Sequence, residues 1–129
     1  MNNSMLLQGF NNHFEEFVSD VQTVFPDDLD VNTAANLLGT LRKANPKMII
    51  KIWKAYISDK YGAQIEKGDI SFFLGKNYGQ DLQDLDSSKR VLDAIEKLRA
   101  PINAMSKENK DKSMKYIQNL TKLSNMYFS

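Results

Sequence analysis

The side chains that could carry out nucleophilic catalysis are few in this chain of 129 residues. It contains a single histidine, His13, and no cysteine, so a Ser–His–Asp or Cys–His arrangement would depend on His13 alone. A structural zinc site needs several histidine or cysteine ligands, which this composition does not supply. We interpret His13 as a partly exposed residue of an acidic, asparagine-rich helix.

The acidic segment after the first apolar stretch begins with the spacing of a calcium loop. Asp28, Asp30 and Asn32 match the first three ligand positions of an EF-hand. The sixth position of such a loop requires glycine and the twelfth a bidentate glutamate, whereas this sequence has Thr33 and Gly39 there. We therefore expect these carboxylates to favour the start of a helix, where they complement its dipole.

A second acidic group, Asp81, Asp84 and Asp86, could bind a hard cation or supply two carboxylates for acid–base catalysis. Such spacing is more typical of a solvated acidic loop. Gly75 and Gly79 lack the spacing and the lysine context of a phosphate-binding P-loop. The sequence therefore predicts no catalytic residue, no metal site and no cofactor, and we do not expect an enzyme.

Four lysines form the most regular basic pattern of the chain. Lys43, Lys47, Lys51 and Lys54 are separated by steps of four, four and three, which would place them in one stripe on a helix face. Such a stripe could neutralise the phosphates of a nucleic acid. The alternative is a solvated face whose charges meet the acidic first helix. The net charge of +1 and the absence of an arginine cluster favour this alternative.

The last residues of the sequence are rich in soft and aromatic apolar side chains. Met126, Tyr127 and Phe128 follow one another in an expected helix, and Met105 and Met114 precede them. Methionine adapts to irregular surfaces, and exposed apolar patches mark interaction sites. We therefore consider Met126, Tyr127 and Phe128 as contacts to a protein partner, with burial in the core as the alternative.

Apolar periodicity predicts the helices that must position these groups. In the first helix, apolar residues recur at steps of three and four: Phe10, Phe14, Phe17, Val18, Val21 and Phe25. Pro26 should end that helix, because it lacks an N–H group. The segment 27–30 leads into a second helix, whose inward residues are Ala34, Leu37, Leu38 and Leu41.

A third helix is expected after Asn45 and Pro46, which suit the cap and the first turn of a helix. Its inward face should hold Ile49, Ile50, Trp53 and Ile57, with Tyr56 at the edge. We predict Gly62 as its C-cap.

The centre of the chain is less regular. Gly68 and Gly75 bracket a short apolar stretch that includes Phe72 and Phe73. One or two helical turns capped by Asp69 would press these side chains into the core. Two strands are the alternative, because so short a stretch does not distinguish a helix from strands.

Two further helices are expected in the last third of the chain. The first is capped by Ser87 or Ser88 and has an inward face of Val91, Leu92, Ile95, Leu98 and Ile102. Pro101 should kink or split it. The last helix should begin near Asn109, with these residues inward: Met114, Ile117, Leu120 and either Met126 or Tyr127.

Together these elements predict an all-α fold, an irregular helical bundle of about five main helices plus the short glycine-bracketed central segment. Residues 1–129 fit a single domain, and a hydrophobic content of 42% suits a packed core. Residues 1–41 carry six acidic groups and no lysine or arginine, whereas residues 42–60 carry six basic groups and one acidic group. We therefore expect neighbouring helices of opposite charge to pair.

No apolar run approaches the roughly 20 residues needed to span a bilayer, so we expect no membrane span. The N-terminal stretch lacks a basic start and soon becomes acidic, which does not fit a secretory signal. Because the chain has no cysteine to form disulfides, we expect an intracellular setting rather than secretion.

A further pattern lies between residues 17 and 82, about half of the chain, in the segments Val24–Asp28, Leu41–Pro46, Ile52–Trp53, Tyr61–Ile65 and Gly68–Tyr78. Its Asn-Pro and Phe-Phe-Leu parts are the most specific. This pattern resembles a family of small proteins encoded by large DNA viruses of algae and protists. That family has no assigned catalytic residues, so the resemblance implies a viral context and, by analogy, a minor capsid or other virion component.

We therefore expect a non-enzymatic structural or protein-interaction protein, with capsid proteins among its partners and a location in the virion or in the host cytoplasm or nucleus. The alternative is a nucleic-acid-associated protein that uses the lysine face from Lys43 to Lys54. A complex that survives nuclease would favour the first expectation, and binding that weakens steeply with salt would favour the second.

Overall fold

A computed structural model of the chain describes residues 3–69 and 86–129, with side chains described from residue 90 onward in the second range. The elements are α1 (Asn3–Val24), α2 (Leu29–Ala44), α3 (Met48–Trp53), η1 (Lys54–Ser58), α4 (Asp59–Glu66), α6 (Asp86–Asn103) and α7 (Lys107–Tyr127). These residues form helices and no strand, which confirms the predicted all-α bundle for the described part of the chain. Several positions singled out in the sequence lie outside the described backbone or side chains: Phe72, Phe73, Gly75, Gly79, Asp81, Asp84, and the side chains of Asp86, Ser87 and Ser88.

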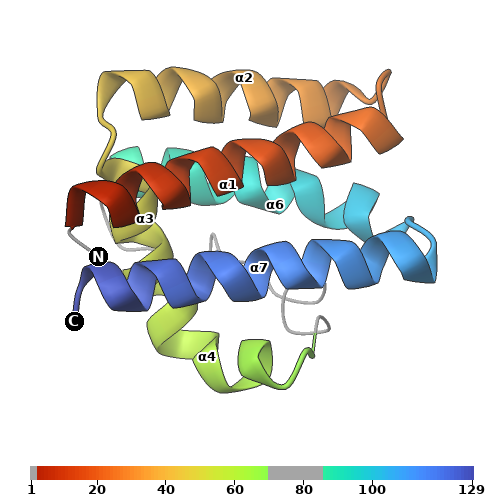
Figure 1. Cartoon of the computed structure of the whole chain (residues 1–129). Coiled ribbons are helices and arrows are strands. Elements are labelled where there is room, and N and C mark those ends of the chain that lie inside the picture. The colour runs from red at the N-terminus through yellow and green to blue at the C-terminus, as the bar shows by residue number, and fades with distance from the viewer. Residues whose placement is uncertain (1–2, 70–85) are drawn as a thin grey trace.

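The long helices lie side by side in an antiparallel bundle (Figure 1). Helix α1 packs between α2 and α7, while α6 packs against α2 and α7 behind α1. Helix α3 contacts all four of these helices near one end of the bundle, and α4 continues from it along α7. The start of α1 and the end of α7 lie at the same end of the bundle (Figure 1).

Helix ends follow the chemistry of the turn residues. Helix α1 ends at Val24, directly before the Phe25-Pro26 step, as predicted. Asp28 is the N-cap of α2, and its side-chain oxygen accepts a hydrogen bond of 3.1 Å from the Val31 N–H. The expected role of this acidic segment at a helix start is thereby confirmed.

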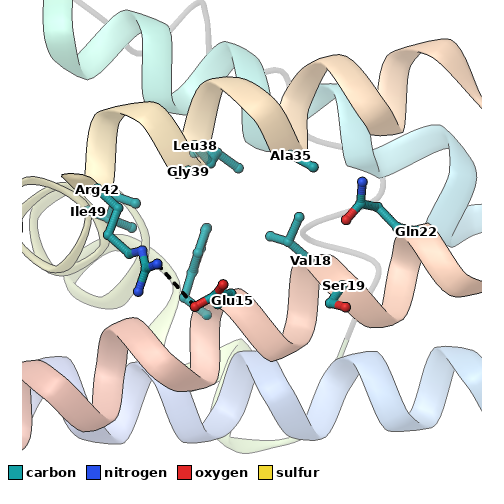
Figure 2. Close-up of a pocket in the computed structure, with 10 residues that line it drawn as sticks. Glu15, Val18, Ser19, Gln22, Ala35, Leu38, Gly39, Arg42 and Ile49 are labelled. Carbon is teal, nitrogen blue, oxygen red and sulfur yellow. Dashed lines mark ion pairs between the residues drawn. The ribbon is translucent and has the colours of Figure 1, made fainter. Parts of the chain in front are cut away.

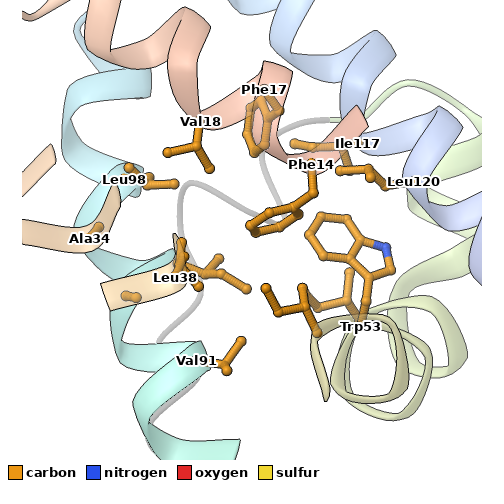
Figure 3. Close-up of a cluster of buried hydrophobic side chains, with 14 of the residues drawn as sticks. Phe14, Phe17, Val18, Ala34, Leu38, Trp53, Val91, Leu98, Ile117 and Leu120 are labelled. Atoms are coloured by element: carbon orange, nitrogen blue, oxygen red, sulfur yellow. The ribbon is translucent and has the colours of Figure 1, made fainter. Parts of the chain in front are cut away.

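The predicted inward residues form one buried cluster to which every described helix contributes. Trp53 is 1% exposed, and its ring lies edge-to-face with Phe14 at a centroid distance of 6.0 Å (Figure 3). It also lies edge-to-face with Phe10, at 6.2 Å. Phe25 and Leu37, which were expected inward, are only partly buried at the margin of the cluster. The prediction that Trp53 belongs to the core is confirmed.

One continuous helical stretch runs through α3, η1 and α4. The prediction of Gly62 as a C-cap is wrong, because the helix passes through it and ends at Glu66. Gly68, with a φ of 78°, is the left-handed residue that follows this helix end. The glycine at the end of this helix is therefore Gly68 and not Gly62.

Element η1 is a single π-helical turn within that stretch. A π turn accommodates an extra residue, so the buried face moves on by one position, from Ile57 to Ser58 and then to Ile65. The Ser58 hydroxyl donates a hydrogen bond of 2.6 Å to Asn125 Oδ1 on α7. The Gln118 amide donates one of 2.9 Å to the Ile65 carbonyl. The π turn therefore aligns the second half of the stretch with α7.

Pro101 lies inside α6, which continues to Asn103. Of the two predicted effects of Pro101, a kink or a split, the split is wrong, because the proline falls in the last turn and removes an N–H only there. Helix α7 begins at Lys107, two residues before the predicted start, because Ser106 is its N-cap. The Ser106 hydroxyl accepts a hydrogen bond of 3.2 Å from the Asn109 N–H.

Candidate functional site

The end of α7 carries exposed apolar side chains, for which the sequence left exposure and burial in the core open. Met126 is 48% exposed and Phe128 is 45% exposed, while Tyr127 between them is partly buried against the core. The rings of Tyr127 and Phe128 meet edge-to-face at a centroid distance of 4.9 Å. We call Met126, Tyr127 and Phe128 the apolar end.

The helical phase of α7 explains this exposure. Ile117, Leu120 and Ser124 lie on the face of α7 that packs into the bundle, and Tyr127 follows in the same phase. Met126 falls away from that face, and Phe128 lies just beyond the last helical residue. Of these three residues, only Tyr127 is partly buried in the core, and Met126 and Phe128 are exposed.

A cleft of about 210 Å³ opens between α1 and α2 (Figure 2). Phe14, Leu38 and Ile49 in its lining are almost fully buried and give it an apolar floor. Ala35 and Gly39, one turn apart on α2, supply little side-chain volume at this point. A Cβ atom added at Gly39 would have no neighbour within 4 Å. The small residues of α2 therefore leave this space between the two helices.

An ion pair lies at one end of the cleft. Arg42 Nη2 on α2 is 3.1 Å from Glu15 Oε2 on α1, as the dashed line in Figure 2 shows. Ser19 and Gln22 line the cleft farther along α1. The cleft thus combines an apolar floor with a polar rim.

The structure corrects the predicted lysine stripe. Lys43 lies in the last turn of α2, and Lys47 precedes the first residue of α3, so the four lysines do not share one helix. The break comes from Asn45, which is the C-cap of α2 and whose Oδ1 accepts a hydrogen bond of 3.2 Å from the Lys47 N–H. Lys43, Lys47 and Lys51 are exposed and take part in no ion pair within the described residues.

Lys54 differs from the other three lysines, because it is paired. Its ammonium group forms a short ion pair with Asp59, five residues later, across the π turn. A spacing of five matches the hydrogen-bond step of a π helix. Lys54 is therefore less available to a partner than Lys43, Lys47 and Lys51.

The acidic first helix is paired by basic groups other than these lysines. Glu15 pairs with Arg42 on α2, and Asp20 Oδ1 is 3.0 Å from Lys112 Nζ on α7. The hydrogen bond from Lys112 to Asp20, together with the attraction between the charges, raises the pKa of Lys112 above its usual value of 10.5. Helices of opposite charge do pair, but α1 pairs with α2 and α7 rather than with the Lys47–Lys54 face.

His13 is partly exposed, as predicted. Its Nδ1 is 3.7 Å from Glu16 Oε2 one turn later, and its ring faces Tyr116 at a centroid distance of 4.8 Å. Within residues 3–69 and 90–129, no three histidine, cysteine or acidic side chains gather in a way that could hold a metal ion. Asp28, the first residue of the calcium-loop spacing, caps α2, and Asp30 Oδ1 is 3.8 Å from Lys97 Nζ.

The cleft between α1 and α2 is the feature that sequence reasoning missed. The available signal was the pair Ala35 and Gly39, small residues at a spacing of four on the face of α2 that turns to α1.

Among the described helices, none combines the length and the apolar character that crossing a bilayer requires. Comparison of the chain with known proteins gives no matching family model, no matching curated protein and no matching solved structure.

Proposed function

We propose that this chain is a non-enzymatic protein-interaction domain that holds a protein partner through its apolar end. The observation that carries the proposal is the exposure of Met126 and Phe128, in the last turn and at the C-cap of α7. Phe128 also contacts the ring of the partly buried Tyr127 at a centroid distance of 4.9 Å, and exposed apolar patches mark protein interaction sites.

The free energy available at the apolar end fits a recognition contact. Complete burial of a methionine or phenylalanine side chain contributes about 1.5–3 kcal/mol. Since Met126 and Phe128 are each about half exposed, covering both would contribute on the order of 1.5–3 kcal/mol in total. Tyr127, held against the core, gives the contact a rigid support. Aromatic anchors of this kind dominate the energetics of many interfaces.

The resemblance to proteins of large DNA viruses supports a role as a minor capsid or other virion component, with capsid proteins as partners. Such a role needs a stable domain that presents binding surfaces, and a helical bundle with an exposed apolar end suits it.

The second candidate function is association with nucleic acid. It is supported by Lys43, Lys47 and Lys51, which are exposed near one corner of the bundle and take part in no ion pair within the described residues. Three lysines that neutralise three phosphates would give a salt slope of about −2.7 for duplex DNA. The pairing of Lys54 with Asp59 and the break between α2 and α3 make this surface smaller than the sequence suggested, so we rank it second.

A nuclease-split pull-down distinguishes the two functions. Tagged protein is captured from the native source, and half of each sample is treated with nuclease before the bound proteins are identified. A protein-interaction domain keeps its partners in both halves. A nucleic-acid-associated protein loses them on treatment, and its variant Lys43→Gln/Lys47→Gln/Lys51→Gln loses them even without treatment. Loss in the treated half would therefore reverse our ranking.

A further inference from the structure

The methionines of the described residues fall into two groups by exposure. Met5 and Met126 are 57% and 48% exposed, whereas Met105 and Met114 are each 6% exposed. Met48 lies between the two groups, because it is partly buried against the core. A thioether sulfur reacts with a peroxide where the peroxide can reach it, so exposure separates the methionines that oxidise readily from those that the core protects.

Met126 belongs both to the exposed group and to the apolar end. We propose that Met126 is an oxidation site, and that conversion of its side chain to methionine sulfoxide switches off the contact between the apolar end and its protein partner. This inference rests on the proposed function, because it concerns regulation of the same surface. It adds a reaction at one atom, the Met126 sulfur, which the proposed function does not require.

The reaction is a two-electron oxidation by hydrogen peroxide. A lone pair of the Met126 sulfur attacks one peroxide oxygen, so that an S–O bond forms while the O–O bond breaks. The departing hydroxide takes the proton of the transferred oxygen and leaves as water. The sulfur is thereby oxidised and the peroxide reduced. A methionine sulfoxide reductase reverses the change with two thiols, which form a disulfide while the oxygen leaves as water.

Oxidation of Met126 changes the surface while the fold is kept. Met126 lies off the face of α7 that packs into the bundle, so an added oxygen meets solvent in the free protein. The Ser129 hydroxyl donates a hydrogen bond of 2.8 Å to the Met126 carbonyl, a backbone contact that does not involve the sulfur. In the complex, however, the sulfoxide oxygen would be buried, and burial of a polar group without a hydrogen-bond partner is unfavourable. Oxidation therefore weakens the contact and leaves the domain folded.

The buried methionines are protected from the same reaction. The Met105 sulfur accepts a hydrogen bond of 3.6 Å from the hydroxyl of Ser113, which is itself fully buried. Met114 lies among the buried residues of α7. Oxidation of Met105 or Met114 would place a polar oxygen in the core and disrupt packing. Mild peroxide treatment that stops at the exposed sulfurs therefore leaves the core intact.

Peptide mapping by mass spectrometry tests the site of oxidation. The purified protein is treated with hydrogen peroxide for increasing times, the peroxide is removed with catalase, and the protein is digested with trypsin. Cleavage after Lys122 releases residues 123–129, in which Met126 is the only methionine. Met126 should oxidise at least about tenfold faster than Met105 and Met114, with an unchanged circular dichroism spectrum. Equal rates at the three positions would overturn the inference.

A pull-down with oxidised protein tests the effect on binding. Tagged wild type, Met126→Leu and Met5→Leu are each treated with peroxide, cleared with catalase and only then mixed with extract of the native source, so that the partners stay unoxidised. Met126→Leu lacks the reactive sulfur, and Met5→Leu is the matched control that removes the other exposed sulfur and keeps Met126. For each protein, recovery of partners after treatment is compared with its own recovery before treatment.

Treatment should lower recovery at least about tenfold for wild type and for Met5→Leu, which corresponds to about 1.4 kcal/mol, and should leave that of Met126→Leu unchanged. A methionine sulfoxide reductase with a thiol reductant should restore the recovery of treated wild type. Unchanged recovery with treated wild type would overturn the inference, as would an equal loss in Met126→Leu. These outcomes concern oxidation alone. The proposed function itself fails if, without peroxide, Met126→Ser/Phe128→Ser recovers partners as well as wild type does.

Discussion

The indole Nε1 of Trp53 donates a hydrogen bond of 3.1 Å to the hydroxyl of Thr121, which is 68 positions away in the sequence. This bond joins the continuous α3–η1–α4 stretch to α7 inside the core. The Thr121 hydroxyl in turn donates a hydrogen bond of 2.8 Å to the Ile117 carbonyl, which orients its oxygen to accept the hydrogen bond from the indole N–H. The α7 helix that presents the apolar end is therefore anchored by a specific buried contact.

Thr121→Val should lower the free energy of unfolding by about 1–3 kcal/mol, because it leaves the buried indole N–H without an acceptor. Urea titration followed by circular dichroism measures the change. Thr121→Ser keeps the hydroxyl and should cost less. Thr23→Val, at an exposed helical threonine whose hydroxyl bonds the Ser19 carbonyl, should stay within about 0.5 kcal/mol. Equal losses at positions 121 and 23 would contradict the role of this bond.

Trp53→Ala should cost about 3–5 kcal/mol, since it empties a site that is in contact with Phe10 and Phe14. The same urea titration provides the value, and Trp53→Phe, which keeps much of the ring volume, should cost less. A change below about 1 kcal/mol in Trp53→Ala would mean that the indole is not part of the core.

Two glycine-to-alanine changes should have opposite signs. Gly39→Ala should raise the free energy of unfolding by up to about 1 kcal/mol, because position 39 is helical and a Cβ there meets open space. Gly68→Ala should lower it by about 1–2 kcal/mol, because the φ of 78° is unfavourable for alanine. Thermal unfolding of both variants measures the two shifts, and shifts of the same sign would be inconsistent with these backbone conformations.

The Asp20–Lys112 pair should make stability depend on pH in the alkaline range. Since folding raises the pKa of Lys112 above 10.5, the contribution of the pair is complete below that pH and is lost as the pH rises through the folded-state pKa. The hydrogen bond to Asp20 is the main cause of the shift, so Asp20→Asn should remove most of it. Urea midpoints between pH 9 and 12 should therefore fall more in wild type than in Asp20→Asn. Parallel curves for the two proteins would refute the assignment.

The helices and their inward faces could be read from the sequence, because apolar periodicity and Pro26 act locally. The end of the third helix could not, because Gly62 and Gly68 are both compatible with a helix end when only neighbouring residues are considered. Tertiary packing decided between them: the π turn at Lys54–Ser58 brings Ser58 and Ile65 onto α7, and this favours continuation through Gly62.

The surfaces were predictable to a smaller extent. The excess of apolar residues at the end of α7 left exposure and burial open, and helix phase decided that Tyr127 is partly buried whereas Met126 is exposed. The lysine stripe failed because regular spacing was counted across Asn45, where the backbone leaves the helix. The cleft depends on how two helices pack, so Ala35 and Gly39 acquired meaning only once α2 was placed against α1.

The central claim is that a protein partner binds the apolar end, and the most direct measurement is a quantitative pull-down after nuclease treatment with three proteins: wild type, Met126→Ser/Phe128→Ser and Leu29→Ser. The partners recovered with wild type should be retained by Leu29→Ser and reduced at least about tenfold with the double variant. Equal recovery with the double variant and wild type would contradict the claim.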